Sequence, residues 1–415
     1  MSEVSLSTIA KVNPAIRIPH DLTANDEVSF IPMSDVSESG DWTTQQTRPL
    51  RSVTTGFTAF EDGDVLVAKI TPCLENGKGA HARGLRNGIG FGSTEFHVLR
   101  AQPGVDPRFV FHVTQSQRFR RAAERQMVGS AGQQRIQRQF FDEFFVREFS
   151  HDEQTLIAKI LDTIDTTIRE TDTIINKLKT LKQGLLHDLL THGINTNGEL
   201  RPPQSEAPHL YKESPLGWIP KEWDSKPLSQ SIVLVSGQHI ATELCNAVGR
   251  GVPYFTGPSD FLGSTTVVTS FTTHPQIICK KGDILITVKG SGCGKVAVAG
   301  VSACISRQLM AISVPADTIR YWFAVLQSLQ ERFNRLATGG NIPGLSREQI
   351  LGIQLSTPSS TAETVLIGER IESLDIRLSI EITKMEKLIE QKKGLIDDLL
   401  TGRVRVTHLL EGTIP

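Results

Sequence analysis

The sequence contains an internal repeat, in which two segments match at a shift of 210 residues. Residues 181–191 read LKQGLLHDLLT and residues 391–401 read QKKGLIDDLLT, with seven identities in eleven positions. Upstream, GDVLV at 63–67 matches GDILI at 282–286 at a slightly different shift, and a Gly-Lys pair follows in both copies. Shifts that drift upstream but stay constant downstream indicate globular parts that diverged by insertion, each followed by a helix of fixed length.

The repeated downstream segment has the spacing of a long amphipathic helix. Twenty positions, here called the seam, follow alternating steps of four and three: Ile157, Leu161, Ile164, Ile168, Thr171, Ile175, Leu178, Lys182, Leu185, Leu189, and the same positions plus 210, Ile367, Ile371, Leu374, Leu378, Glu381, Met385, Leu388, Lys392, Leu395, Leu399. Eight of the ten positions are apolar in each copy, and the polar exceptions fall at the same two places. This spacing predicts a coiled coil.

Both predicted helices begin with the same capping signal and need a partner. Ser150-x-x-Glu153 and Ser360-x-x-Glu363 are each typical of a capping box. A helix of about 40 residues is ~60 Å long, and its apolar stripe would face water if it stood alone. The chain order of domain, helix, domain, helix favours antiparallel pairing of the two helices, with the domains at opposite ends. A bundle with the helices of another protein is the alternative.

A glycine lies near the end of each predicted helix, and a polar stretch follows the first helix. Gly184 and Gly394 lie near the helix ends, where a glycine costs ~1 kcal/mol relative to alanine. Their presence in both copies suggests a close backbone approach, although a simple weakness of the helix would also explain it. Residues 193–220 are rich in Asn, Gly, Pro and Ser without periodicity, which predicts a loop or a semi-extended connection.

The globular parts combine short strands with one helix each. β-like runs occur at 65–70, 284–288 and 296–299, broken by Gly, Asn and Pro. Helices are expected at roughly 107–127 and 317–336, each ending before a glycine. Both globular domains are therefore expected to be mixed α+β.

Charge is segregated along the chain, although the net charge is only −1. Residues 69–138 carry twelve Lys or Arg against four Asp or Glu, and residues 289–347 carry seven against two. Residues 1–68 are acidic, with four basic residues against ten acidic ones. One basic segment in each half is the footprint expected of a DNA-binding protein. Two surfaces that are basic by chance remain the alternative.

Several protein classes are disfavoured by the sequence. No run approaches the ~18 apolar residues that a membrane helix needs, and the first residues do not form a secretory signal. The cysteines are odd in number and lack a C-x-x-C pair, which argues against a disulfide framework or a zinc site and favours the reducing cytoplasm. They are Cys73, Cys245, Cys279, Cys293 and Cys304.

Motifs of enzymes are incomplete in this sequence. Residues 290–295, GSGCGK, resemble a phosphate loop, but Lys289 replaces its first glycine and Val296 replaces its final Ser/Thr, so a tight turn between strands is expected instead. Residues 13–16, NPAI, lack the aromatic residue of an adenine-methyltransferase motif, and no glycine-rich cofactor loop accompanies them. The nuclease-like E-x-K at 390–392 falls in the coiled coil, and the histidines show no metal spacing. The chain alone is not expected to be an enzyme or to bind a metal.

Taken in order, these features resemble the specificity subunit of type I restriction-modification enzymes. The resemblance rests on the duplicated G-D-[VI]-L-[VI] strand with its Gly-Lys turn, TGGNIPG at 338–344, GWIPKEW at 217–223, and the G-L-[LI]-x-D-L-L-T helix ends. No single motif is specific, but their order and duplication span nearly the whole chain.

The resemblance implies two target recognition domains in a pseudo-twofold arrangement, joined by two long antiparallel coiled-coil helices. In that family each recognition domain reads one half of a split double-stranded DNA target, while the helices set the spacing and dock two methyltransferase subunits. Restriction subunits, which translocate and cut DNA, join the same assembly. This chain would bind no cofactor itself; S-adenosylmethionine, ATP and Mg²⁺ are expected on the partner subunits. Because the two domains differ greatly, we expect two different half-sites.

The expected domain boundaries follow from the repeat. They are a first target recognition domain at 1–149, a helix at 150–192, a linker at 193–220, a second recognition domain at 221–358, a second helix at 359–402 and a tail at 403–415.

Candidate DNA contacts are Arg, Lys, Asn, Gln and Ser side chains near the matched turns. Arg and Lys reach guanine edges or phosphates, whereas Asn and Gln can pair with adenine. For each single residue, an ordinary solvated side chain is an equal alternative. The candidates are Lys69, Asn76, Lys78, Arg83, Arg86, Gln133, Gln134 and Arg135 in the first domain, and Lys289, Ser291, Lys295, Arg307 and Asn341 in the second.

Three functions are compared. The leading hypothesis is a DNA-recognition scaffold, the second is a coiled-coil adaptor whose domains bind proteins, and the third is a self-contained nuclease or methyltransferase. Phosphate-dominated binding weakens log-linearly with salt, which separates the first from the second. The missing motifs disfavour the third.

Overall fold

The computed structural model describes residues 2–40, 42, 44–130, 132–290, 292–337 and 344–411. The chain divides into two compact units. Unit 1 contains Met1–Thr173 and Thr383–Pro415, and unit 2 contains Ile174–Ile382. The division differs from a linear series of domains because each long helix contributes one part to each unit. Among the described residues, no helix is long and apolar enough to cross a membrane.

Unit 1 is built from short strands, short helices and parts of the two long helices. Its strands are β1 Glu3–Ser5, β2 Ala10–Val12, β3 Glu27–Ile31, β4 Gln46–Pro49, β5 Thr58–Glu61, β6 Val65–Ala68, β7 Gly79–His81, β8 Ile89–Gly92, β9 Phe96–Ala101 and β10 Phe145–Arg147. Its short helices are α1 Leu6–Ile9, α2 Pro107–Gln115, α3 Gln117–Arg125, α4 Phe140–Glu143 and α10 Thr407–Glu411. The four-stranded sheets have the orders β2-β9-β6-β7 and β4-β3-β8-β5, and β1 pairs with β10.

Unit 2 repeats this plan with additional strands. Its strands are β11 Tyr211–Ser214, β12 Gly217–Pro220, β13 Trp223–Pro227, β14 Val233–Ser236, β15 Cys245–Asn246, β16 Val252–Phe255, β17 Phe261–Leu262, β18 Thr265–Thr266, β19 Phe271–Thr272, β20 Ile278–Cys279, β21 Ile284–Thr287, β22 Val296–Val298, β23 Ala303–Ile305, β24 Leu309–Ser313 and β25 Gln354–Pro358. Its short helices are α6 Ile319–Ser328, α7 Gln330–Ala337 and α8 Arg347–Leu351. Its larger sheets have the orders β14-β24-β21-β22-β18-β17 and β15-β19-β16-β23-β20.

The duplication predicted from sequence is confirmed by the strand pairing. In both units a central strand, β6 or β21, lies between the same two neighbours, β9 and β7 or β24 and β22. The parallel pair β3–β8 has its counterpart in β16–β23. The pair β1–β10 likewise corresponds to β13–β25. Each globular part is thus α+β, as the mixed pattern of short strands and helices predicts.

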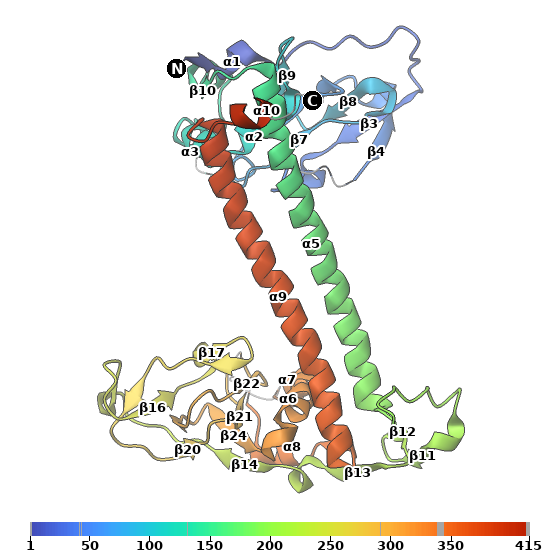
Figure 1. The fold of residues 1–415 in the computed structure, drawn as a ribbon, viewed down its shortest axis with the longest axis vertical. Coiled ribbons are helices and arrows are strands. Elements are labelled where there is room, and N and C mark those ends of the chain that lie inside the picture. The colour runs from blue at the N-terminus through green and yellow to red at the C-terminus, as the bar shows by residue number, and fades with distance from the viewer. Residues whose placement is uncertain are drawn as a thin grey trace. The chain divides into compact units, whose positions relative to one another are not determined.

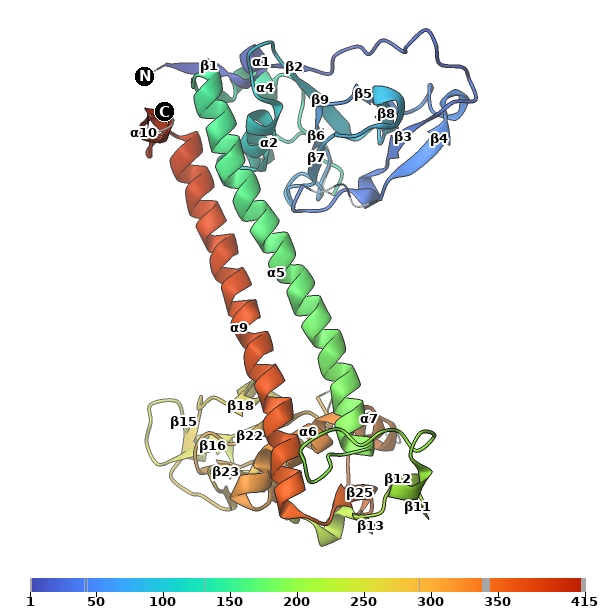
Figure 2. The ribbon, with the colours of Figure 1, turned by 45° about the vertical axis from the view of Figure 1, so that its right-hand side comes forward.

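The two long helices are α5, His151–Thr191, and α9, Thr361–Leu400. In unit 1 Leu399 of α9 belongs to the core that also holds Ile157 of α5. In unit 2 Leu189 of α5 shares a core with Ile367 of α9. Because each unit combines the start of one helix with the end of the other, the helices run antiparallel, as predicted (Figures 1 and 2). None of the twenty seam side chains is exposed.

The polar seam lysines form reciprocal ion pairs between the helices. Lys392 pairs with Asp165 in unit 1, and Lys182 pairs with Asp375 in unit 2. The partners are related by the same shift of 210 residues, since 182 and 392 differ by 210, as do 165 and 375. A charge at a seam position therefore faces an opposite charge in both copies, which explains why an apolar stripe tolerates it.

The capping signal at α5 is confirmed, whereas the one at α9 is only partly formed. Ser150 Oγ accepts from Glu153 N–H (3.3 Å), and Glu153 accepts from Ser150 N–H (3.1 Å). Ser360 Oγ also accepts from Glu363 N–H (3.4 Å). The Glu363 carboxylate, however, accepts from Arg201 and Trp223 instead of closing a capping box. A buried arginine competes successfully with a backbone donor for this carboxylate.

The close backbone approach expected at Gly184 and Gly394 is not found. A Cβ built on either glycine meets no atom of the described chain within 4 Å. Both glycines lie on exposed helix surface. The expectation was wrong because a repeated helical glycine, although it destabilises the helix, need not pack against another part of the chain.

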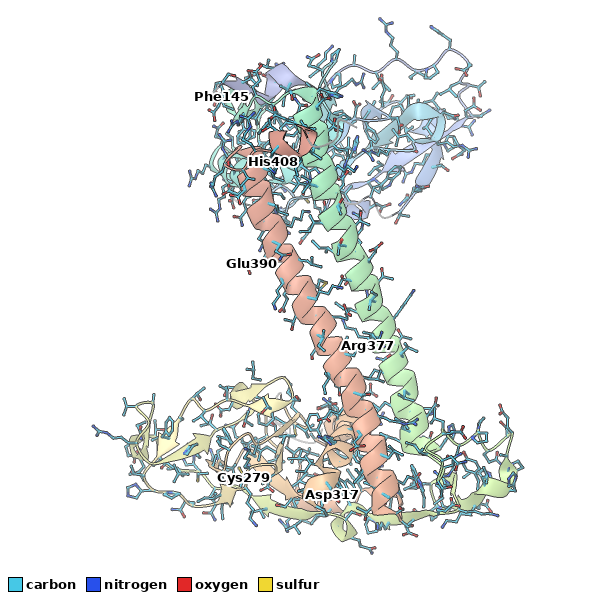
Figure 3. All side chains as sticks on the ribbon, in the orientation of Figure 1. Phe145, Cys279, Asp317, Arg377, Glu390 and His408 are labelled. Atoms are coloured by element: carbon cyan, nitrogen blue, oxygen red, sulfur yellow. The ribbon has the colours of Figure 1, made fainter. Side chains whose placement is uncertain are left out.

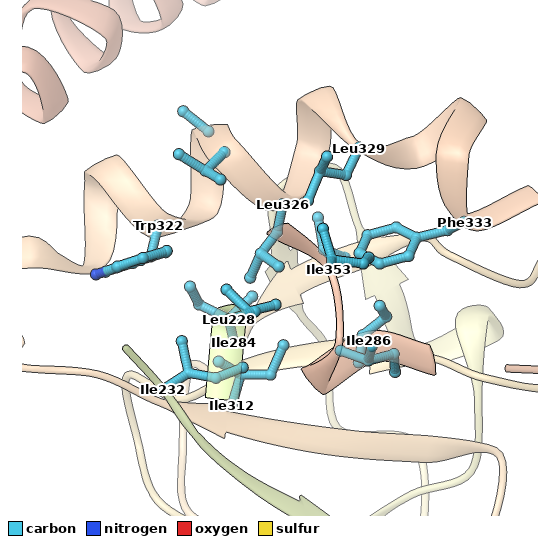
Figure 4. Close-up of a cluster of buried hydrophobic side chains, with 14 of the residues drawn as sticks. Leu228, Ile232, Ile284, Ile286, Ile312, Trp322, Leu326, Leu329, Phe333 and Ile353 are labelled. Carbon is cyan, nitrogen blue, oxygen red and sulfur yellow. The ribbon is translucent and has the colours of Figure 1, made fainter. Parts of the chain in front are cut away.

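Each predicted domain helix is instead a pair of short helices. Ser116 separates α2 from α3 with an extended backbone, and its Oγ accepts from Phe119 N–H (3.1 Å). In unit 2, Leu329 separates α6 from α7. The break turns Trp322, Leu326 and Phe333 onto the sheet residues Ile284, Ile286 and Ile312 (Figure 4). Apolar spacing continued across the break and concealed it in the sequence.

The connection between the halves is more structured than the sequence predicted. Strands β11 and β12 form a hairpin within residues 193–220 (Figure 2). Tyr211 and Ile219 of this hairpin are buried. Arg201 forms an ion pair with Glu363 at the start of α9, with N–O 2.5 Å. Gly and Pro in this segment therefore mark a hairpin and its turns, where a loop or a semi-extended connection was expected.

Candidate nucleic-acid interface

The matched Gly-Lys turns have the same construction in both units. Gly77 and Gly294 adopt positive φ angles of 75° and 83°. A Cβ on Gly77 would lie 2.7 Å from Arg120, and one on Gly294 would lie 2.7 Å from Gln330. Glycine is required at both turns, because the backbone is left-handed and the second helix of the pair lies directly behind it. Each turn precedes the strand, β7 or β22, that pairs with the central strand of the sheet.

In unit 1 the structure brings Lys69 together with the predicted loop 133–135. The Lys69 carbonyl accepts from Ile136 N–H (3.0 Å), and Thr71 N–H donates to the Gln134 carbonyl (3.0 Å). Arg135 forms a two-pronged ion pair with Glu95, with a shortest N–O distance of 2.8 Å. These hydrogen bonds hold the pKa of Glu95 below its usual value. The predicted contacts Lys69, Gln133, Gln134 and Arg135 thus form one surface.

Asn76 and Lys78 lie on the adjoining turn but contact another segment of unit 1. Asn76 Nδ2 donates to Glu38 (2.8 Å), and Lys78 Nζ donates to the Met33 carbonyl (3.2 Å). Both side chains thus use, within the protein, the polar groups that were predicted to contact DNA. Binding of a phosphate by Lys78 would therefore compete with a single hydrogen bond to a carbonyl.

Arg83 and Arg86 lie away from this surface. Arg83 lines a cavity of about 610 Å³ beside α5, together with Asp106 and Asp162. Burial, and then the nearby Arg108 guanidinium, lower the pKa of Arg83. Arg86 is exposed on the turn before β8, and its backbone N–H donates to Ser29 Oγ (2.8 Å). The basic segment 69–138 is thus divided between more than one face of unit 1.

In unit 2 the predicted lysines flank the turn between β21 and β22. Lys289 and Lys295 are both exposed, and Thr287 N–H donates to the Lys295 carbonyl (2.9 Å). Cys293 N–H donates to the Gly290 carbonyl (3.1 Å), so the described residues here lie in a tight turn, as expected from the incomplete phosphate-loop motif. Arg307 is exposed at the adjacent end of β24, where Val288 N–H donates to the Gln308 carbonyl (2.8 Å). Ser291 and Asn341 lie outside the described residues.

Sequence reasoning missed Glu95 and Gln308, which lie on the turns that precede β9 and β24. Glu95 and Gln308 occupy equivalent places in the two units, each beside a predicted basic contact. The pattern Ser-x-[Glu/Gln] before an apolar strand, at 93–95 and 306–308, could have identified them. Glu95 was overlooked because carboxylates were not among the residue types considered as DNA contacts.

A cluster of ionisable groups joins α2 to the long helices in unit 1. His112, Asp162 and Asp165 place one ligand atom each within 4.8 Å of one another. Arg108 and His112 donate to Asp162, and Lys392 pairs with Asp165. Although burial alone would raise it, the hydrogen bonds from His112 and Arg108 hold the pKa of Asp162 well below its usual range. Because cations already occupy both carboxylates, this arrangement is an ion-pair network that fixes α2 against α5.

The nuclease-like E-x-K motif lies on a helix surface. Glu390 projects from α9 (Figure 3) and is exposed. Lys392 is engaged with Asp165 across the seam. Glu390 therefore faces solvent while Lys392 faces the other helix, because helix positions two apart point in different directions.

The family model and the related proteins that match this chain are all described as type I restriction specificity proteins. A family model described as the type I restriction modification DNA specificity domain matches residues 220–391. The chain is similar to the type I restriction enzyme EcoAI specificity subunit of Escherichia coli, with 41% identity over 140 residues, covering 33% of this chain and 23% of that protein. It is also similar to the putative type I restriction enzyme MjaX specificity subunit of Methanocaldococcus jannaschii, with 26% identity over 259 residues, 61% of this chain and 58% of that protein. The chain thus spans less than two thirds of either relative.

The fold is similar to that of a solved structure over nearly its whole length. The type I restriction-modification system S subunit from M. genitalium aligns with a TM-score of 0.60 and 17% identity, covering 96% of each chain. This likeness concerns the fold, in which two α+β parts are combined with two long helices.

Proposed function

Since this chain belongs to the family of type I restriction-modification specificity subunits, we propose that it recognises an asymmetric, bipartite sequence in double-stranded DNA. The globular part of each unit would read one half-site. The observation that carries the proposal is the duplicated Gly-Lys turn, which places the carbonyl-bound Lys78 and the exposed Lys295 at matched positions of the two units. The two units share their architecture but differ in their side chains, as expected of two domains that read different DNA sequences.

We further propose that the long helices act as a spacer and as docking surfaces for two methyltransferase subunits. A 41-residue helix has a length of ~60 Å, which exceeds the ~34 Å of one DNA turn. The chain would contribute recognition and no chemistry. S-adenosylmethionine would be bound by the methyltransferase subunits, and ATP and Mg²⁺ by restriction subunits of the same complex.

Salt dependence tests the DNA-binding function. The chain, assembled with its methyltransferase partner, should bind duplex DNA with an affinity that falls log-linearly with salt, by a slope of about −0.9 per phosphate contact. Replacing Lys78 or Lys295 by alanine should weaken binding to all sequences similarly and reduce the slope by about 1. Salt-independent binding would favour the protein-binding adaptor instead.

A further inference from the structure

The turn before β9 in unit 1 and the turn before β24 in unit 2 have the same backbone arrangement. Glu95 N–H donates to Ser93 Oγ (3.2 Å), and Gln308 N–H donates to Ser306 Oγ (3.1 Å). The Glu95 carbonyl accepts from Lys69 N–H (2.9 Å), as the Gln308 carbonyl accepts from Val288 N–H (2.8 Å). Each turn is therefore fixed beside the end of the central strand, next to the predicted DNA contacts.

The side chains on these two turns differ in chemistry. Unit 1 has Thr94 and Glu95, and the Glu95 carboxylate is paired with Arg135. Unit 2 has Arg307 and Gln308, both exposed. Among the described residues, neither the Arg307 guanidinium nor the Gln308 carboxamide has a hydrogen-bond or ion-pair partner. The same rigid position thus presents different hydrogen-bonding groups in the two units.

A recess lies beside this turn in unit 2. It has a volume of about 290 Å³, and its lining includes His239, Tyr254 and Ser270 besides Arg307 and Gln308. Its walls are fixed: the Tyr254 hydroxyl accepts from Ile240 N–H (3.4 Å). Gln308 has room because position 257 is glycine, where a Cβ would lie 2.8 Å from the carboxamide oxygen.

Ser306 ties the turn to the wall of the recess. Its side chain is buried, and its hydroxyl donates to the Thr256 carbonyl (2.5 Å). The carbonyl of Ser306 accepts from Leu309 N–H (3.0 Å), which closes the turn. The backbone beneath Arg307 and Gln308 is therefore set by buried contacts, and the two side chains can change without altering it.

We propose that this turn determines half-site specificity, with Arg307 and Gln308 reading base edges in unit 2 and Thr94 and the Glu95–Arg135 pair reading them in unit 1. The assignment rests on the proposed function. Arginine pairs bidentately with guanine and glutamine with adenine, whereas a carboxylate accepts from the cytosine amino group. The backbone of this turn is the same in both units, but its side chains differ. The turn is therefore suited to recognise a different DNA sequence in each half-site.

The test exchanges the chemistry of one turn for that of the other. The double variant Arg307→Thr/Gln308→Glu, assembled with the methyltransferase partner, is compared with the wild type by mapping methylated sites on random duplex DNA. We expect about a tenfold loss of methylation at the original sequence, confined to one or two base pairs of one half-site. The other half-site serves as an internal control and should be unchanged.

Two further variants make the outcome decisive. Gln276→Glu adds one negative charge, as Gln308→Glu does, but at another exposed position of unit 2. It should leave the methylated motif unchanged. Gln308→Glu alone keeps the size of the side chain and should alter the preference at one base pair. An unchanged motif in the exchange variants, or an equal loss on every sequence, would overturn the assignment. If the wild-type complex showed no sequence preference at all, the proposed function itself would fail.

Discussion

Glu363 shows at the residue scale how a buried charge is satisfied. Its carboxylate accepts from the Arg201 guanidinium, Trp223 Nε1–H and Ile194 N–H, and its side chain and that of Arg201 are 9% and 8% exposed. Glu363→Gln leaves the buried Arg201 with only the exposed Glu222 carboxylate, 3.6 Å away, so we expect a loss of about 3 kcal/mol in the free energy of unfolding, the lower end for a broken buried ion pair. The exposed control Glu369→Gln should cost less than about 1 kcal/mol. Equal effects in denaturant titrations would contradict this assignment.

Buried histidines of unit 1 make its stability depend on pH. Burial lowers the pKa of His81 to about 3, and also lowers those of His97 and His112. The unfolded chain, with a histidine pKa near 6.5, binds protons that the folded chain does not. Stability is therefore complete above about pH 6.5 and falls as the pH drops toward 3, by roughly 1.4 kcal/mol per pH unit for His81.

The variant His81→Gln tests this pH dependence. It should reduce the slope of unfolding free energy against pH between pH 6.5 and 5, whatever its effect on absolute stability. His20→Gln replaces an exposed histidine of the same unit and should leave the slope unchanged. If His81→Gln kept the full slope in denaturant titrations at each pH, this histidine would not be a source of acid sensitivity.

At the scale of elements, the reciprocal lysine–aspartate pairs allow a matched comparison. The Lys392 and Asp165 side chains are 18% and 9% exposed, whereas Lys182 and Asp375 are 24% and 38% exposed. Solvent screens the second pair more, so double-mutant cycles should give a coupling of about 1–3 kcal/mol for Lys392–Asp165 and below about 1 kcal/mol for Lys182–Asp375. Exchanging Lys392 and Asp165 together should restore stability lost by either reversal. The reverse order of couplings would contradict the burial argument.

Periodicity predicted the long helices well and the short elements less well. Seam residues such as Leu161 and Ile371 repeat over many turns, so one face is defined regardless of tertiary contacts. The break at Ser116 depends on a single hydroxyl that caps the next helix, and the apolar spacing continues through it. Equally, Arg135 was a plausible DNA contact from sequence, but its partner Glu95 is 40 residues away and only the fold brings them together.

At the scale of the whole molecule, the proposed spacer role of the long helices would set the distance between the half-sites. Removing one heptad from the middle of each helix, around residues 174 and 384, keeps both the heptad spacing and the antiparallel pairing and shortens each helix by ~10 Å. The number of unspecified base pairs in the target should change, by at most about three at 3.4 Å per base pair, while both half-sites stay the same. Mapping methylated sites with the shortened chain measures this. A target with its original spacing would contradict the spacer role.

The proposed function requires that one chain carries two different DNA readers. Methylated adenines should therefore be mapped across the DNA of cells that express this chain with its methyltransferase subunit. The proposed function predicts one motif made of two unlike half-sites, separated by a constant number of unspecified base pairs. A continuous or palindromic motif, or methylation that is independent of this chain, would contradict it.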